Sequence, residues 1–270
     1  MLGIFEVSKE ETINLSSTNT KLMSEITVSL FVPCFIDQFY PSVAFNTIKV
    51  LERAGVSVEY NPEQTCCGQP AYNSGNWEEA RKLGIKFISD FGDGNIVVAP
   101  GASCIGYFKN QFRQLFKGDD ESLLRAEMLA PKMYELTDFL VNVLQKTELG
   151  AFFPHKVTYH DSCSALRECG IKNEPRQLLA AVEGLKLSEM QDVEMCCGFG
   201  GTFMTKFKDI SAAMTREKLE RAMNTGASFI VSSDSSCLMS MDTYIRKNGL
   251  PIRTMHIADI LASGANDFWE

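Results

Sequence analysis

The sequence is poor in the features that mark membrane-spanning, nucleic-acid-binding and secreted proteins. No apolar run among its 270 residues approaches the roughly 18 to 20 residues that span a bilayer. Its 26 Lys and Arg are scattered along the chain and are outnumbered by 34 Asp and Glu, which gives a net charge of −8. Nucleic acids and anionic membrane surfaces are therefore disfavoured as partners, because both attract clustered positive charge.

The N-terminal segment lacks the basic and then apolar pattern of an export signal. Residues 1–24 are polar, and we expect them to form a poorly ordered N-terminal extension. Without an export signal we expect a cytoplasmic protein, whose thiols are kept reduced. The nine cysteines are then not expected to form disulfides, and metal binding or redox chemistry becomes the leading interpretation.

Several cofactor-binding motifs are missing as well. No Cys-x-x-Cys pair is present, so the knuckles typical of structural zinc sites are absent from the sequence. The glycine-rich stretch "CGFGGTF" fails the G-x-G-x-x-G spacing, and we interpret it as a turn that wraps a metal site. The sequence also lacks the C-x-x-C-x-x-C run of a ferredoxin. We therefore expect a chain that does not oxidise a substrate and pass on its electrons alone.

Eight of the nine cysteines recur in two matching sets. The first set is Cys34, Cys66, Cys67 and Cys104, and the second is Cys163, Cys196, Cys197 and Cys237. Equivalent cysteines are separated by 129, 130, 130 and 133 residues. Four independent positions rarely agree this closely, so the sequence indicates an internal duplication.

The segments around the cysteines alternate between strand and helix patterns. "TVSLFVPC" and "KVTYHDSC" are typical of short strands that end at a cysteine, and "NIVVAPGASC" and "SFIVSSDSSC" of buried strands followed by a turn. Helical patterns lie between them, which predicts an α/β fold of two tandem Rossmann-like parallel-sheet repeats related by internal duplication. We place the first cysteine-rich domain at residues 25–148 and the second at residues 149–270.

This fold predicts where the sulfurs lie. Ligands of parallel sheets bind outside the carboxyl ends of the strands, so each set of four cysteines is expected to converge on one pocket in its own half. Thiolates in this number favour an iron–sulfur cluster, with zinc in one or both pockets as the alternative. Gly68 and Gly198, which follow the paired cysteines, are expected to bring backbone N–H groups close to sulfur.

Other residues near the second set have weaker assignments. Cys169 has no counterpart in the first half, and we expect a structural or spare thiol. His160 is a candidate metal ligand or proton carrier, although a structural role is favoured for a single unpaired histidine. Asp161 and Arg167 flank the site and are candidates for tuning its potential, with solvated surface positions favoured.

The motifs "VPCFIDQFYP", "CCGQPAYNSG", "YHDSC" and "CCGFGGTF" resemble those of the cysteine-rich (CCG) domain family, most closely the lactate utilization protein A type of Fe–S oxidoreductase. The resemblance covers residues 26–262. It implies a cytoplasmic iron–sulfur subunit of a complex that oxidises L-lactate to pyruvate with partner proteins, among them a ferredoxin-type Fe–S protein. All eight repeated cysteines would then be cluster ligands.

The chain departs from the fullest family motif at one position in each half. Heterodisulfide reductase relatives carry a fifth cysteine where this chain has Gly101 and Asp234. Four sulfurs in each half favour an ordinary [4Fe–4S] cluster or a centre with an open coordination position. The alternatives are a heterodisulfide reductase-like thiol/disulfide subunit, a zinc-stabilised scaffold subunit, and a complex for another 2-hydroxy acid or for glycerol phosphate.

Overall fold

The computed structural model describes residues 26–92 and 94–267, so the expected extension at residues 1–24 lies outside the described part. Two four-stranded sheets, both parallel throughout, have the orders β2-β1-β3-β4 and β6-β5-β7-β8. The strands of the first sheet are β1 (Thr27–Leu30), β2 (Ser57–Tyr60), β3 (Ile96–Ala99) and β4 (Met133–Glu135). Those of the second are β5 (Lys156–Tyr159), β6 (Lys186–Leu187), β7 (Phe229–Ser232) and β8 (Arg253–His256). The predicted α/β fold of two tandem repeats is confirmed.

Helices precede or follow each strand. In the first half they are α2 (Cys34–Phe39), α3 (Pro41–Arg53), α4 (Gln69–Asn73), α5 (Trp77–Phe91), α6 (Ala102–Leu115), α7 (Asp120–Leu129) and α8 (Leu136–Asp138), with the short helices η1 (Ala130–Lys132) and η2 (Phe139–Val143). In the second half they are η3 (Ser164–Glu168), α9 (Glu174–Ala180), α10 (Thr202–Lys206), α11 (Lys208–Asn224), α12 (Ser235–Asn248) and α13 (Ile257–Leu261). Of these described helices, none combines the length and the apolar character needed to cross a bilayer.

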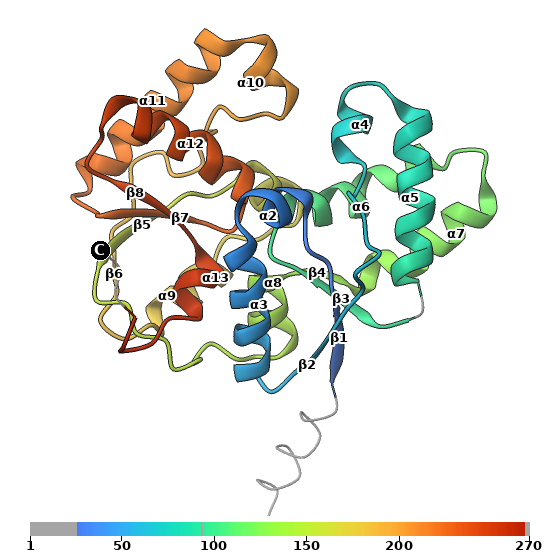
Figure 1. Ribbon diagram of the computed structural model, residues 1–270, viewed down its shortest axis with the longest axis horizontal. Coiled ribbons are helices and arrows are strands. Elements are labelled where there is room, and N and C mark those ends of the chain that lie inside the picture. The colour runs from blue at the N-terminus through green and yellow to red at the C-terminus, as the bar shows by residue number, and fades with distance from the viewer. Residues whose placement is uncertain (1–25, 93, 268–270) are drawn as a thin grey trace, which may run out of the picture.

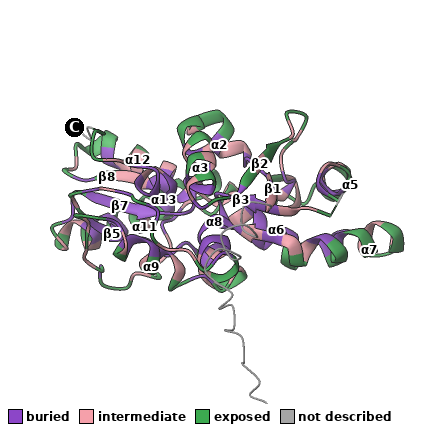
Figure 2. Cartoon of the chain, turned by 90° about the horizontal axis from the view of Figure 1, so that it is seen from below, coloured by how far each residue is buried: buried purple, intermediate pink, exposed green. Residues whose placement is uncertain are grey.

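The helices form layers on both sides of each sheet (Figure 1). Helices α3, α8, α9 and α13 lie between the two sheets, while α5, α6 and α7 cover the outer face of one sheet and α11 and α12 that of the other. The largest hydrophobic core joins both halves, because Val50 of α3 and Ile260 of α13 belong to it together with strand residues of both sheets. Figure 2 shows buried residues on the central strands β3 and β7 and exposed ones on outer helices such as α7.

The central strands of the two halves have the same hydrogen-bond register. Phe31, just after β1, donates its N–H to the carbonyl of Val98 at 2.9 Å. His160, just after β5, donates its N–H to the carbonyl of Val231 at 2.8 Å. Phe31 and His160 are therefore equivalent, and so are the positions that follow them as far as Cys34 and Cys163.

Each half contains one strand more than the sequence predicts. The additional strands β4 and β8 are short and run directly into α8 and α13. Each is only three or four residues long and contains one Met among other residue types, so no apolar run marks it in the sequence. The domain division remains our proposal. It places the boundary between the two domains after the end of η2 at Val143 and before the start of β5 at Lys156.

Candidate metal centre

The four cysteines of the first set lie in contact beyond the carboxyl ends of β1 and β3. Cys34 begins α2, the pair Cys66–Cys67 forms the turn before α4, and Cys104 lies in the first turn of α6. Cys66 is in hydrogen-bonding contact with both Cys34 and Cys67, and Cys67 with Cys104. The first set therefore forms one continuous group of sulfurs.

The electrostatics of the first set favour a thiolate at Cys66 beside neutral thiols at Cys34 and Cys67. Hydrogen bonds from Cys34 and Cys67, together with one from the Gly68 N–H, lower the pKa of Cys66 to about 3. The hydrogen bond to Cys66 and burial raise the pKa of Cys34, and the contacts with Cys104 and Cys66 together with burial raise that of Cys67. A cation would be stabilised here, because a metal lets the remaining thiols ionise.

The second set is partly contiguous. Cys197 is in hydrogen-bonding contact with Cys196 and with Cys237, which lies in the first turn of α12. The hydrogen bond to Cys197 is the main cause of the raised pKa of Cys196. Cys163 is exposed and interacts with Cys196 and Cys237 through charge alone. Three sulfurs are therefore grouped, and the fourth stands at the edge.

The two glycines after the cysteine pairs take the expected role. The N–H of Gly68 donates to Cys66 Sγ at 3.5 Å, and that of Gly198 donates to Cys196 Sγ at 3.4 Å. Both glycines have left-handed backbones, with φ of 90° and 89°. A Cβ at Gly198 would lie 2.6 Å from the carbonyl oxygen of Ser211. Only glycine lets the turn approach α11 and direct its N–H at sulfur.

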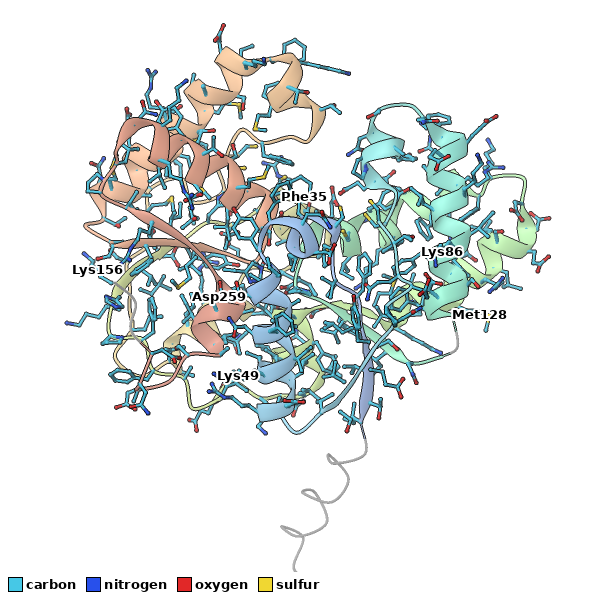
Figure 3. All side chains as sticks on the ribbon, in the orientation of Figure 1. Phe35, Lys49, Lys86, Met128, Lys156 and Asp259 are labelled. Carbon is cyan, nitrogen blue, oxygen red and sulfur yellow. The ribbon has the colours of Figure 1, made fainter. Side chains whose placement is uncertain are left out.

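Both sets line the same cavity, which differs from the expectation of one pocket in each half. Seven of the eight cysteines line a cavity of about 490 Å³ that takes residues from both halves. Phe35, labelled in Figure 3, lies where the halves meet, and its ring contacts that of Phe199 at a centroid distance of 5.6 Å. The shared core between the sheets brings the carboxyl ends of both sheets to this cavity.

Beneath the second set lie two buried polar residues. His160 is 1% exposed, and one of its ring nitrogens lies with Cys197 Sγ and Cys237 Sγ in a group whose atoms are all within 4.8 Å of one another. Burial and then the charge of Lys218 lower the pKa of His160, which keeps the imidazole neutral. Lys218 is fully buried and donates from Nζ to the carbonyl of Val193 at 2.6 Å.

The remaining sequence-based assignments have different outcomes. Cys169 packs beside the Ala102 carbonyl, to which its thiol donates at 3.5 Å. This contact is consistent with the expected structural thiol. The expected surface position of Asp161 is wrong, because the residue is 2% exposed. Its two carboxylate oxygens accept hydrogen bonds from Arg176 at 2.9 and 3.0 Å, which compensates the buried charge.

Lys218 was not found by sequence reasoning. It lies in the charged helix α11, where a lysine is normally read as solvent-exposed. No local pattern in the sequence marks it. In the structure Leu83 approaches Gly68 and Met214 approaches Gly198, and this correspondence aligns Lys218 with the buried Phe87.

The donor set fits a soft or borderline metal. Groups of thiols supplied by rigid turns and accepting N–H hydrogen bonds suit iron–sulfur clusters and zinc, whereas hard cations prefer oxygen ligands. A nearby imidazole suits zinc and iron as well.

Comparison with known proteins agrees with this geometry. The cysteine-rich domain family (CCG) matches residues 28–109 and 157–242. The chain is 44% identical over 239 residues to lactate utilization protein A of an Exiguobacterium species, covering 88% of this chain and 97% of that one. It is also 44% identical over 234 residues to the protein of the same name from Geobacillus thermodenitrificans, covering 87% and 98%.

The solved structures agree on the fold. The crystal structure of a hypothetical protein from Helicobacter pylori superimposes with a TM-score of 0.59 at 10% identity, covering 96% of this chain and 55% of that one. Because that identity is low, the likeness shows the α/β fold alone. The sequence relatives reach further, and the chain belongs to the cysteine-rich (CCG) domain family and, within it, to the family of lactate utilization A proteins.

Proposed function

We propose that the chain is the iron–sulfur subunit of a complex that oxidises L-lactate to pyruvate, and that it carries electrons through cysteine-ligated clusters. The observation that carries the proposal is that two equivalent sets of cysteines open onto one cavity. Lactate as the substrate rests on the names of the relatives, which align over nearly their whole length.

We assign one centre to each set of cysteines. Cys34, Cys66, Cys67 and Cys104 would hold the first centre, and Cys163, Cys196, Cys197 and Cys237 the second. A bound cluster supplies one-electron transfer, at a potential set by its ligands, by hydrogen bonds to sulfur and by exposure. The chain's own contribution is the pair of N–H groups from Gly68 and Gly198, which stabilise negative charge on Cys66 and Cys196.

Four sulfurs in each half support a [4Fe–4S] cluster as the most economical assignment. Where some relatives have a fifth cysteine, Asp234 instead caps α12, and its Oδ1 accepts a hydrogen bond from the Ser236 N–H at 3.2 Å. In the first half Gly101 occupies this position. Zinc in one or both sets is the alternative occupant, because thiols and a nearby imidazole also suit that ion.

The chain needs partners for this activity. Its sequence contains no ferredoxin-type cysteine run and no flavin or nicotinamide fingerprint. We therefore place lactate oxidation in a cytoplasmic complex and assign electron exchange to a ferredoxin-type Fe–S protein. The shared cavity supports this arrangement, since a partner docked over it would reach both sets of cysteines.

The test uses a tagged copy of the chain, isolated without oxygen from its own cells together with the proteins bound to it. L-lactate should bleach the visible absorption of the clusters and produce the electron paramagnetic resonance signal of reduced iron–sulfur centres. The Cys67→Ser variant should lose the first centre. The matched control Cys169→Ser, at the cysteine outside both sets, should behave like the unaltered chain.

The substrates offered decide between the proposals. Reduction by glycolate or glycerol 3-phosphate but not by L-lactate would assign the subunit to another complex. Reduction by none of the three would overturn a role in 2-hydroxy-acid or glycerol phosphate oxidation.

One observation favours a thiol/disulfide reductase as the second candidate. Cys163 is exposed at the edge of the second set and lines the cavity, where a substrate sulfur would reach it. The isolated, cluster-loaded chain would then reduce a heterodisulfide with dithionite as the electron source. Turnover that is lost in Cys163→Ser would establish this activity, whereas no turnover would exclude it.

A further inference from the structure

The two halves differ in the residue that lies beneath each group of cysteines. In the first half this is Phe31, whose ring contacts Phe87 and Phe108 at centroid distances of 5.1 and 6.1 Å. In the second half the equivalent residue is His160, held by the same backbone hydrogen bond to the central strand. A duplicated fold thus keeps an apolar ring under one set and an imidazole under the other.

The imidazole of His160 has no hydrogen-bond partner among the described residues. Its residue is only 1% exposed, and both Nδ1 and Nε2 are buried without a partner. A buried unsatisfied polar group costs about 1–3 kcal/mol, so a ring with both nitrogens unpaired points to a partner beyond the protein's own atoms. A structural histidine would show such a partner on at least one nitrogen.

The two nearest ligand atoms are sulfurs of the second set. One ring nitrogen of His160, Cys197 Sγ and Cys237 Sγ all lie within 4.8 Å of one another. A metal bound between them would satisfy the imidazole and would take a soft or borderline ligand set of two sulfurs and one nitrogen. Cys163, the fourth cysteine of this set, is exposed and stands apart.

The position of Lys218 repeats the asymmetry. It aligns with Phe87, the ring that packs against Phe31 in the first half. Lys218 is buried close to Cys197 and Cys237 of the second set. Both members of an aromatic pair in one half are therefore polar in the other.

We propose that His160 takes the place assigned above to the exposed Cys163 and is a nitrogen ligand of the second centre, beside Cys196, Cys197 and Cys237, while the first centre is held by sulfur alone. The inference rests on the proposed function in that it requires a metal centre in the second half. Replacing an anionic thiolate ligand by a neutral imidazole removes negative charge, and it raises the potential of iron–sulfur centres that use it. The second centre should therefore be the more easily reduced of the two.

The test compares metal-loaded protein carrying His160 with His160→Phe, which copies the residue of the first half, and with His160→Gln. The matched control is His155→Gln, a half-buried histidine of the same half whose ring packs on Phe153 and Phe229. Pulsed electron paramagnetic resonance of the reduced protein should detect a strongly coupled ¹⁴N nucleus. That coupling should be lost in both His160 variants and kept in the His155 variant. If the second half takes up zinc, X-ray absorption at the zinc edge should show scattering from an imidazole ligand. This scattering should be lost in both His160 variants and kept in the His155 variant.

The outcomes separate this inference from the proposed function. Bound metal with only the weak couplings of backbone amides, and no imidazole signal, would overturn the role of His160 and leave the proposed function standing. A strong nitrogen signal that survives in His160→Gln would also overturn it. A chain that binds neither iron nor zinc would overturn both. Circular dichroism of each variant confirms that the comparison is made on folded protein.

Discussion

Lys218 is expected to destabilise the metal-free protein near neutral pH. Its side chain is fully buried, and burial lowers the pKa of its ammonium from 10.5 to about 8, despite the opposing charges of Asp161 and the cysteines. Replacing it by methionine, as Lys218→Met, keeps an unbranched apolar stem and removes the charge. The side chain also loses its hydrogen bond to the Val193 carbonyl.

The magnitude follows from the two pKa values. Their difference of about 2.5 corresponds to about 3.4 kcal/mol, at about 1.36 kcal/mol for each pKa unit. The lost hydrogen bond offsets about 1 kcal/mol of this gain. We therefore expect Lys218→Met to raise the free energy of unfolding at pH 7 by about 2 kcal/mol.

The pH dependence gives the sign of the effect. Between pH 8 and 10.5 the unfolded chain binds more protons at this lysine than the folded chain, so stability rises with pH. Below pH 8 the destabilisation is complete, and above pH 10.5 it is absent. The gain in the free energy of unfolding from Lys218→Met should therefore be constant below pH 8 and should disappear as the pH rises to 10.5.

The assay is urea denaturation of reduced, metal-free protein at a series of pH values. The free energy of unfolding of the parent is subtracted from that of the variant at each pH, so that the contributions of other titrating groups cancel. Lys208→Met, at the exposed start of the same helix, serves as the matched control and should leave the profile unchanged. A Lys218→Met protein that is less stable at pH 7, or a difference that does not vary between pH 8 and 10.5, would refute the reasoning.

Two further predictions concern the scaffold of the second site. Gly198→Ala should destabilise the chain by about 3 kcal/mol or more, because a residue at positive φ is strained and its Cβ would lie 2.6 Å from a backbone oxygen of α11. Gly55→Ala serves as the control, because Gly55 has a φ of +84° but open space around it, and this variant should lose about 1 kcal/mol of stability. Equal losses of stability in the two variants, measured by thermal unfolding, would contradict the prediction. Arg176→Ala should lower stability by about 3–5 kcal/mol, since it leaves the buried carboxylate of Asp161 unpaired. Lys172 forms an exposed ion pair with Glu194, so Lys172→Ala should barely change the melting temperature. Similar melting curves for Arg176→Ala and Lys172→Ala would show that burial of the Asp161 carboxylate does not affect stability.

Local patterns predicted much of the fold. Among the helical patterns expected between the strands is α3, and Gly55, just after its end, has the left-handed backbone of a helix C-terminus. The strand patterns before Cys34 and Cys163 correspond to β1 and β5, so the cysteines lie beyond the strand ends as predicted. These features depend on neighbouring residues, and therefore a single sequence contains them.

The arrangement of the two halves could not be predicted in the same way. It depends on contacts between residues far apart in the chain, such as the hydrogen bond from Asn46 of α3 to Asp259 of α13 at 2.7 Å. These contacts bring both sets of cysteines to one cavity instead of two pockets. The buried position of Lys218 was missed for a related reason, since a charged residue in a helix is normally exposed and only tertiary packing buries this one.

The most direct measurement is the content of iron, acid-labile sulfide and zinc in protein purified and reconstituted without oxygen. Two cysteine-ligated clusters predict sulfide in proportion to iron, with about eight irons for each chain if both centres are [4Fe–4S]. Cys67→Ser and Cys197→Ser should each remove about half of both elements, one centre at a time. Zinc without sulfide in both sets, or full iron and sulfide content in both variants, would contradict the account.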